Sequence, residues 1–168
     1  DHLGSSAGRF DEAKLRWVNA QHLKALDNTV LAPLVAEQLA KRGITADARL
    51  PALCALYKDR CDTTVALADW VQAHYADVSP TAEELAQHVT DVVKPAIASL
   101  AARLQTCAWD KASIAAALKE TLAEHGLKMP QLAMPVRVLV MGTPNTPSLD
   151  AVLELHDREK IVGRLQKA

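Results

Sequence analysis

The chain has 168 residues, of which 49% are hydrophobic, and its formal net charge is −1. This is enough apolar material for one large domain or two small ones with a buried core, and an aromatic content of only 4% favours an all-α fold over a sheet. A net charge this close to zero excludes a general attraction for nucleic acid or anionic membranes, so any such binding has to depend on a local patch of charge.

Four helices are predicted in the first part of the chain, over about residues 11–26, 30–42, 48–58 and 62–76. Asp11 can accept hydrogen bonds from the unpaired N–H groups at the start of the first helix, where Phe10 and Leu15 stand at the two positions of a hydrophobic staple. The second helix should end at Gly43, because glycine most readily adopts the left-handed conformation of a helix C-cap.

The clearest boundary in the sequence lies near residue 80. Pro80 suits the first turn of a helix, and Thr81 and Glu84 have the spacing of a capping box. We therefore divide the chain into two helical subdomains, residues 1–80 and 81–168.

The second subdomain begins with a long apolar stripe of helical period from Leu85 to Leu104. Pro95 lies within this stripe and should kink the helix, because proline removes one backbone hydrogen bond. Asp110 should begin the next helix and Gly126 should end it.

Residues 136–141 are ambiguous, because Val-Arg-Val-Leu-Val-Met has the composition of a strand. Pro135 equally suits the first turn of a short helix, and the sequence offers no convincing second strand for pairing. We predict a helix here. Ser148 can cap a further helix that runs to about His156, and a last helix is expected over residues 157–166.

The usual sequence signatures of catalysis and metal binding are missing. The chain has no GxGxxG or GxxxxGKS/T phosphate loop and no GxSxG nucleophile elbow. Its cysteines (Cys54, Cys61 and Cys107) form no CxxC pair and its histidines are scattered singly, so we expect free thiols and no metal site. No apolar run approaches the roughly 20 residues of a membrane span and no signal-peptide pattern is present, which predicts a cytoplasmic protein without a membrane partner.

Two arginines stand out from the other charged residues. Arg137 lies inside the apolar run 136–141, where a guanidinium is costly to bury unless it meets carbonyls, an acid or a ligand. Arg60 lies between Asp59 and Asp62. In the simpler alternative, Arg137 extends its stem to reach solvent and Arg60 pairs with one of the flanking aspartates. The residue types alone leave both alternatives open.

Two segments carry a resemblance to a known family. Residues 10–19 (FDEAKLRWVN) resemble the FDxxKLxWxN segment that follows the catalytic half of bacterial glutamyl-tRNA synthetases. Residues 134–138 (MPVRV), Gly142 and residues 146–149 (TPSL) resemble the PLRxxxTG...PxL signature near that family's C-terminus. The order and spacing match over essentially the whole chain.

The resemblance implies that the chain is the tRNA anticodon-binding half of a class I aminoacyl-tRNA synthetase. It implies an all-α fold, with residues 1–80 as the stem-contacting and first anticodon-binding subdomain and residues 81–168 as the second. The implied partner is tRNA(Glu), bound by a monomer, with no DNA partner. ATP and magnesium would belong to the absent catalytic half, so this part should hold no cofactor and should be inactive by itself.

The resemblance also implies roles for individual residues. Arg60 corresponds to the arginine with which discriminating members read the third anticodon base, and its presence favours an enzyme that charges only glutamate tRNA. Arg137 corresponds to the arginine near the first anticodon bases, and Lys119 to a basic residue that helps to hold the loop backbone. The loop that packs against and hydrogen-bonds those bases corresponds to Thr146, Pro147 and Leu149.

Several positions depart from the family pattern, among them Val136, residues 4–6 and residues 155–159, and one alternative function stays open. Residues 155–159 read Leu-His-Asp-Arg-Glu where the family usually has Leu-Gly-Lys-Glu. The alternative is a helical protein-interaction module without catalytic activity, which would display an exposed apolar groove lacking a basic rim.

Overall fold

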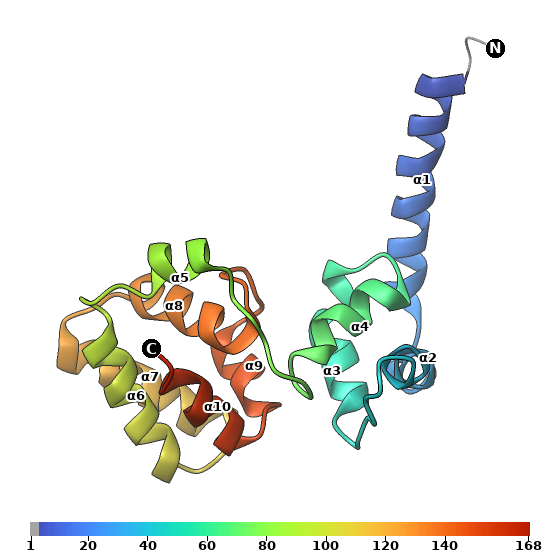
Figure 1. Ribbon diagram of the computed structural model, residues 1–168. Helices are drawn as coiled ribbons and strands as arrows, with labels where there is room; N and C mark the ends of the chain where they lie inside the picture. Colours follow the sequence, from blue (N-terminus) through green and yellow to red (C-terminus); the bar gives the residue numbers. More distant parts are fainter. Residues whose placement is uncertain (1–3) are drawn as a thin grey trace. The chain divides into compact units, whose positions relative to one another are not determined.

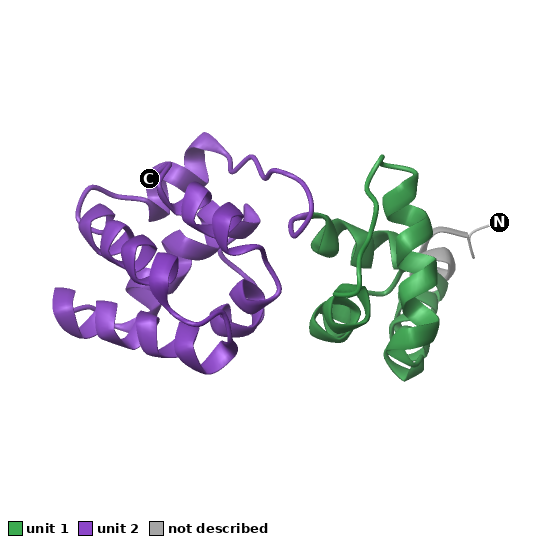
Figure 2. Ribbon diagram, turned by 90° about the horizontal axis from the view of Figure 1, so that it is seen from below, with its two compact units in different colours: residues 1–72 green, residues 73–168 purple. Residues whose placement is uncertain are grey.

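All regular elements in the described residues are helices, which confirms the all-α prediction (Figure 1). The structure is a computed structural model that describes the backbone of residues 4–168 and the side chains from residue 11 onward. The chain forms two compact units, Asp1–Gln72 and Ala73–Ala168, which are coloured separately in Figure 2.

The first unit is built around α2, which packs against both α3 and α4. Its core contains fully buried side chains such as Leu31, Leu53 and Leu67. In Figure 1, α1 extends beyond the other helices of this unit, and Leu15 and Trp17 on it are 59% and 65% exposed. The helices of the unit are α1 (Gly4–Ala25), α2 (Asn28–Ala40), α3 (Leu50–Tyr57), the 3₁₀ turn η1 (Lys58–Arg60) and α4 (Thr64–Gln72).

The start of α1 differs from the prediction. The helix begins at Gly4, so Asp11 lies inside it and is not its N-cap. Residues 4–10 contain no proline, so nothing in them prevents the helical conformation from continuing upstream of Asp11. The side chain of Phe10, one half of the expected staple, lies outside the described residues. The end of α2 also differs from the prediction. The helix ends at Ala40 with Lys41 as its C-cap, and Gly43, which is left-handed with a φ of +76°, lies in the turn that follows.

The second unit surrounds α8, which contacts α5, α6, α7 and α10. Residues 136–141 are the last part of this helix, which confirms the helical prediction. Strand-like composition is compatible with a helix here because most of these side chains are buried among neighbouring helices. The helices of this unit are α5 (Ala82–His88), α6 (Lys94–Thr106), α7 (Lys111–His125), α8 (Met129–Met141), α9 (Leu149–Glu154) and α10 (Arg158–Leu165).

Most helix ends follow the sequence signals. Asp110 accepts a hydrogen bond from the Ser113 backbone N–H at 2.8 Å, and Gly126 ends α7 with a φ of +63°. Ser148 precedes α9, where it accepts from the Val152 N–H through its backbone carbonyl at 3.1 Å rather than through its side chain.

The expected kink at Pro95 is wrong, because the helix is interrupted there. The helix α5 ends at His88, and α6 starts at Lys94 with Pro95 in its first turn. A proline is tolerated in a first turn, where its missing N–H would have no partner, so the chain starts a new helix instead of bending one.

The two units divide after Gln72, whereas the sequence placed the boundary near residue 80 and extended α4 to residue 76. The segment 73–76 belongs to the second unit because α10 binds its carbonyl groups. Arg164 donates to the carbonyls of Ala73 and Ala76, and Lys160 donates to that of Tyr75 at 2.9 Å. The ring of His74 also stacks on His156, with centroids 3.7 Å apart.

Candidate nucleic-acid interface

The end of α8 and the loop after it bring Arg137 and Thr146 together. The Nε of Arg137 donates a hydrogen bond to the Thr146 hydroxyl at 2.9 Å, and that hydroxyl donates to the Pro147 carbonyl at 2.8 Å. Arg137 is half-buried and Thr146 is 8% exposed. The guanidinium is therefore held at a defined place beside the loop.

The loop itself is shaped by its two ends. Gly142 ends α8 with a φ of +75°, a left-handed conformation that reverses the chain at low steric cost. Leu149 begins α9 and is 4% exposed, so it anchors the other end in the core of the second unit. Four predicted residues are thus gathered at one site, which we call the Arg137 cluster: Arg137, Thr146, Pro147 and Leu149.

A buried arginine, Arg164, holds the end of α8 in place. Arg164 is 6% exposed, and its guanidinium donates to the carbonyls of Ala73 at 2.8 Å, Val140 at 2.9 Å and Ala76 at 2.9 Å. Burial lowers the pKa of Arg164, an effect that the charge of Asp77 opposes. Because Val140 lies in the last turn of α8, this contact holds the part of the helix that carries Arg137.

Arg60 lies on the exposed surface of the first unit, in η1. Its guanidinium carbon is 5.8 Å from the ring centroid of Trp70, and Trp70 stacks on Tyr57 with centroids 5.2 Å apart and planes at 16°. Tyr57 is fully buried, and this burial raises the pKa of its hydroxyl. Among the described residues, no carboxylate lies within ion-pair distance of the Arg60 guanidinium, so the simpler alternative, in which Arg60 pairs with Asp59 or Asp62, is not realised.

Lys119 is an exposed residue of α7. No hydrogen bond or ion pair within the described part of the chain joins it to the Arg137 cluster. The structure therefore gathers four of the six predicted residues in the second unit, carries Lys119 on α7 without a polar contact to them among the described residues, and carries Arg60 on the first unit.

Sequence reasoning missed Trp70 and Arg164. No sequence signal indicates Arg164, because its partners are backbone carbonyls and two of them are 88 and 91 residues away. The sequence gives a weak signal for Trp70. Tyr57 and Arg60 are three residues apart near a helix end, and Trp70 lies on α4, the helix that follows closely.

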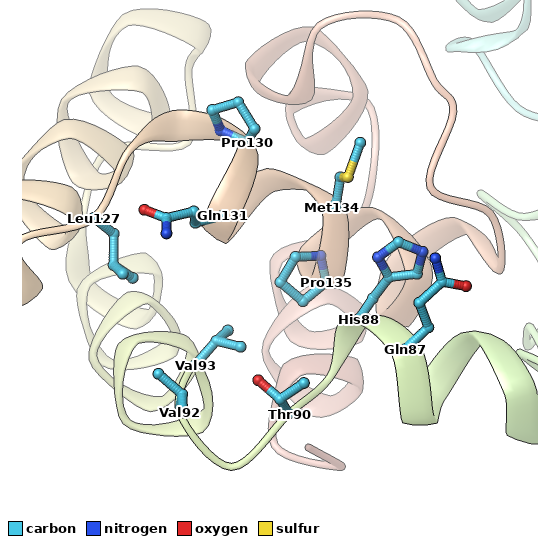
Figure 3. A pocket seen from close by; sticks show the side chains of 10 residues that line it. All are labelled: Gln87, His88, Thr90, Val92, Val93, Leu127, Pro130, Gln131, Met134 and Pro135. Carbon is cyan, nitrogen blue, oxygen red and sulfur yellow. The ribbon is translucent and has the colours of Figure 1, made fainter.

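A separate groove of about 360 Å³ lies in the second unit, where the α5–α6 turn faces the start of α8 (Figure 3). Val92 at its edge is 84% exposed and Met134 is 39% exposed. None of its lining residues is a lysine or an arginine. They are Gln87, His88, Thr90, Val92, Val93, Leu127, Pro130, Gln131, Met134 and Pro135.

No group of three or more metal-binding side chains occurs in residues that the structure describes. Over the same residues, no helix has both the length and the apolar character that crossing a membrane requires.

A protein-family model described as "Anticodon binding domain" matches residues 23–168, which include both units' candidate residues. The chain belongs to the anticodon binding domain family. This anticodon binding domain is 65% identical to the glutamate–tRNA ligase of Albidiferax ferrireducens over 99% of the chain, and 67% identical to that of Paracidovorax citrulli over 100% of it. In both cases the chain spans about a third of the relative's length, 36%.

The fold of this anticodon binding domain also occurs in a solved structure. A glutamate tRNA ligase from Elizabethkingia meningosepticum superimposes with a TM-score of 0.83, covering 90% of this chain and 31% of that one. The two sequences are 18% identical, so this likeness concerns the arrangement of the helices alone.

Proposed function

We propose that this chain recognises the anticodon of tRNA(Glu) as the anticodon-binding part of a glutamate–tRNA ligase. The observation that carries the proposal is the Arg137 cluster, which lies inside the region that matches the family. An arginine has five N–H donors in a rigid fork, and a base that is unstacked from an RNA loop exposes a hydrogen-bonding edge to it. A guanidinium already oriented by Thr146 loses less freedom when it binds such an edge.

Further proposals concern the whole protein and the individual residues of this chain. We propose that the complete enzyme activates glutamate with ATP and magnesium in another part of its chain and transfers it to tRNA, and that it acts as a cytoplasmic monomer. Within the present chain, Arg60 reads the third anticodon base and the Arg137 cluster binds the first two. Lys119 contributes a phosphate contact, which positions RNA without selecting its sequence.

Binding of an RNA hairpin that carries the anticodon stem and loop of glutamate tRNA tests this proposal. Arg137→Ala should weaken binding by about 5- to 150-fold, because a bidentate arginine–base contact contributes roughly 1–3 kcal/mol. Fluorescence anisotropy at two salt concentrations measures this, and hairpins changed at each anticodon base report the preference. Lys111→Ala, which removes an exposed charge on α7 outside the proposed site, is the control. Equal affinity of wild type and Arg137→Ala for every hairpin would contradict the proposal.

The groove in Figure 3 favours a second candidate function. Its exposed apolar edge and its lining without lysine or arginine are the features expected of a helical protein-interaction module. The family membership favours RNA recognition, so this second function becomes the better one only if the wild-type chain shows no salt-dependent binding of the hairpin.

A further inference from the structure

We infer that Trp70 is a positioning residue for Arg60, whose indole ring holds the guanidinium in place to meet the edge of the third anticodon base. The inference rests on the proposed function, because it takes Arg60 as a base-reading residue. It adds a second residue, on another helix, to that recognition step.

The three side chains of the stack become more exposed in order from core to surface. Tyr57 at the end of α3 is fully buried, Trp70 in α4 is half-buried, and Arg60 in η1 is exposed. The indole stacks on this fully buried ring with the two planes at 16°, and the guanidinium carbon lies 5.8 Å from the indole centroid. The surface arginine thus rests on a support that is anchored in the core.

The carboxylates near this stack do not compete with the Trp70 ring for the Arg60 guanidinium. Asp69, the neighbour of Trp70, is already paired with Arg42 at 2.7 Å. An unsupported arginine on a surface samples many rotamers, whereas a cation held near an aromatic face samples fewer. Contact with a ring face also uses none of the N–H donors, so these stay available for a base edge.

A second arginine–tryptophan pair in the chain provides the contrast. The Arg158 guanidinium lies 4.9 Å from the centroid of Trp109, but it donates to the Leu104 carbonyl at 2.6 Å, and the Trp109 indole N–H donates to the His156 carbonyl at 2.8 Å. The polar groups of that pair are used inside the second unit. The Arg60–Trp70 pair faces solvent, as a recognition element must.

The test measures how strongly the chain prefers the natural third anticodon base. Dissociation constants are determined for the glutamate hairpin, for a hairpin changed at the third base and for one changed at the second base. Trp70→Leu removes the ring and should reduce the third-base preference by about 2- to 5-fold, while leaving the second-base preference unchanged. Trp70→Phe retains an aromatic face and should keep most of the preference. Trp109→Phe is the matched control and should leave it unaltered.

Two further variants separate positioning from a structural role. Arg60→Ala should abolish the third-base preference, and adding Trp70→Leu to Arg60→Ala should change that preference no further, because the ring acts through the guanidinium. If Trp70→Leu does not fold, as judged by circular dichroism, Trp70→Met removes the ring with a longer side chain and takes its place.

Distinct results overturn the inference and the proposed function. A third-base preference that Arg60→Ala removes but both ring-deleting variants leave intact would overturn the role of Trp70 and leave the proposed function standing. An equal loss of affinity for all three hairpins in the ring-deleting variants would also overturn it, because that result indicates general destabilisation. A wild-type chain that binds all three hairpins equally would contradict the proposed function itself.

Discussion

Arg60 and Arg137 are held in place by different kinds of contact. Arg137 is half-buried and joined to the hydroxyl of Thr146, in a loop bounded by a left-handed glycine and a buried leucine. Arg60 is exposed and is supported only by the ring of Trp70 among the contacts described for its guanidinium. The hydrogen bond to Thr146 fixes the direction of the Arg137 guanidinium, because a hydrogen bond weakens steeply when it is bent. The Arg60 guanidinium keeps some lateral freedom, because a cation over a ring can shift across its face.

This difference predicts how each site tolerates change. The Arg137 cluster should depend on main-chain geometry, so substitutions at its distant supports should affect both stability and binding. The Arg60 site should depend on one aromatic side chain, and substitutions there should alter base preference with little effect on folding. Variants of Arg164 and Thr146 test the expectation for the Arg137 cluster, and variants of Trp70 test the expectation for the Arg60 site.

Arg164→Met should have the largest effect. It leaves the carbonyls of Ala73, Val140 and Ala76 without their charged donor, and hydrogen bonds to charged groups contribute roughly 1.5–3 kcal/mol each without being additive. We expect the free energy of unfolding to fall by about 3 kcal/mol, with weaker hairpin binding because the last turn of α8 loses its support. Urea unfolding measures the first effect. Unchanged stability would show that the clamp is dispensable.

Thr146→Val should have an intermediate effect. Valine keeps the shape of threonine but removes the hydroxyl that accepts from Arg137 and donates to Pro147. We expect stability to fall by about 1 kcal/mol and hairpin affinity by about 3- to 10-fold. Thr146→Ser keeps the hydroxyl and is the matched control. If serine and valine weaken binding equally, the hydrogen bond does not orient Arg137.

The sequence predicted the residues of the Arg137 cluster but not the contacts that support them. Arg137 could be found because a single charge inside an apolar run needs a partner. Gly142 and the loop residues Thr146, Pro147 and Leu149 were indicated only by the resemblance to a known family. Arg164 could not be found, since its partners are carbonyls brought near only by the packing of α10 against the segment 73–76. The break before Pro95 was missed because the apolar stripe continues across it with helical spacing.

Helix capping could be predicted from the sequence where the cap and its partner are close together in the chain. Asp110 is such a cap, and its substitution should have the smallest effect on stability. The backbone and side-chain hydrogen bonds from Ser113 hold the pKa of Asp110 below its ordinary value. A carboxyl group with a lowered folded pKa stabilises the fold above its unfolded pKa, and that contribution is lost as pH falls through the folded pKa. Part of the acid sensitivity of the second unit, below about pH 4, should therefore come from this cap.

Asp110→Asn separates the hydrogen bond from the charge. Asparagine is as good an N-cap as aspartate, so the melting temperature near pH 7 should change little. The fall in melting temperature between about pH 4 and pH 2 should become shallower than in the wild type, because one titrating group has been removed. Asp27→Asn makes the same change at the start of α2, where Asp27 accepts from the Thr29 N–H at 2.9 Å. The opposite outcome is an acid dependence of the second unit that is unaltered in Asp110→Asn but shallower in Asp27→Asn. It would show that the two units do not respond to pH independently, and their sites could then not be compared as properties of separate units.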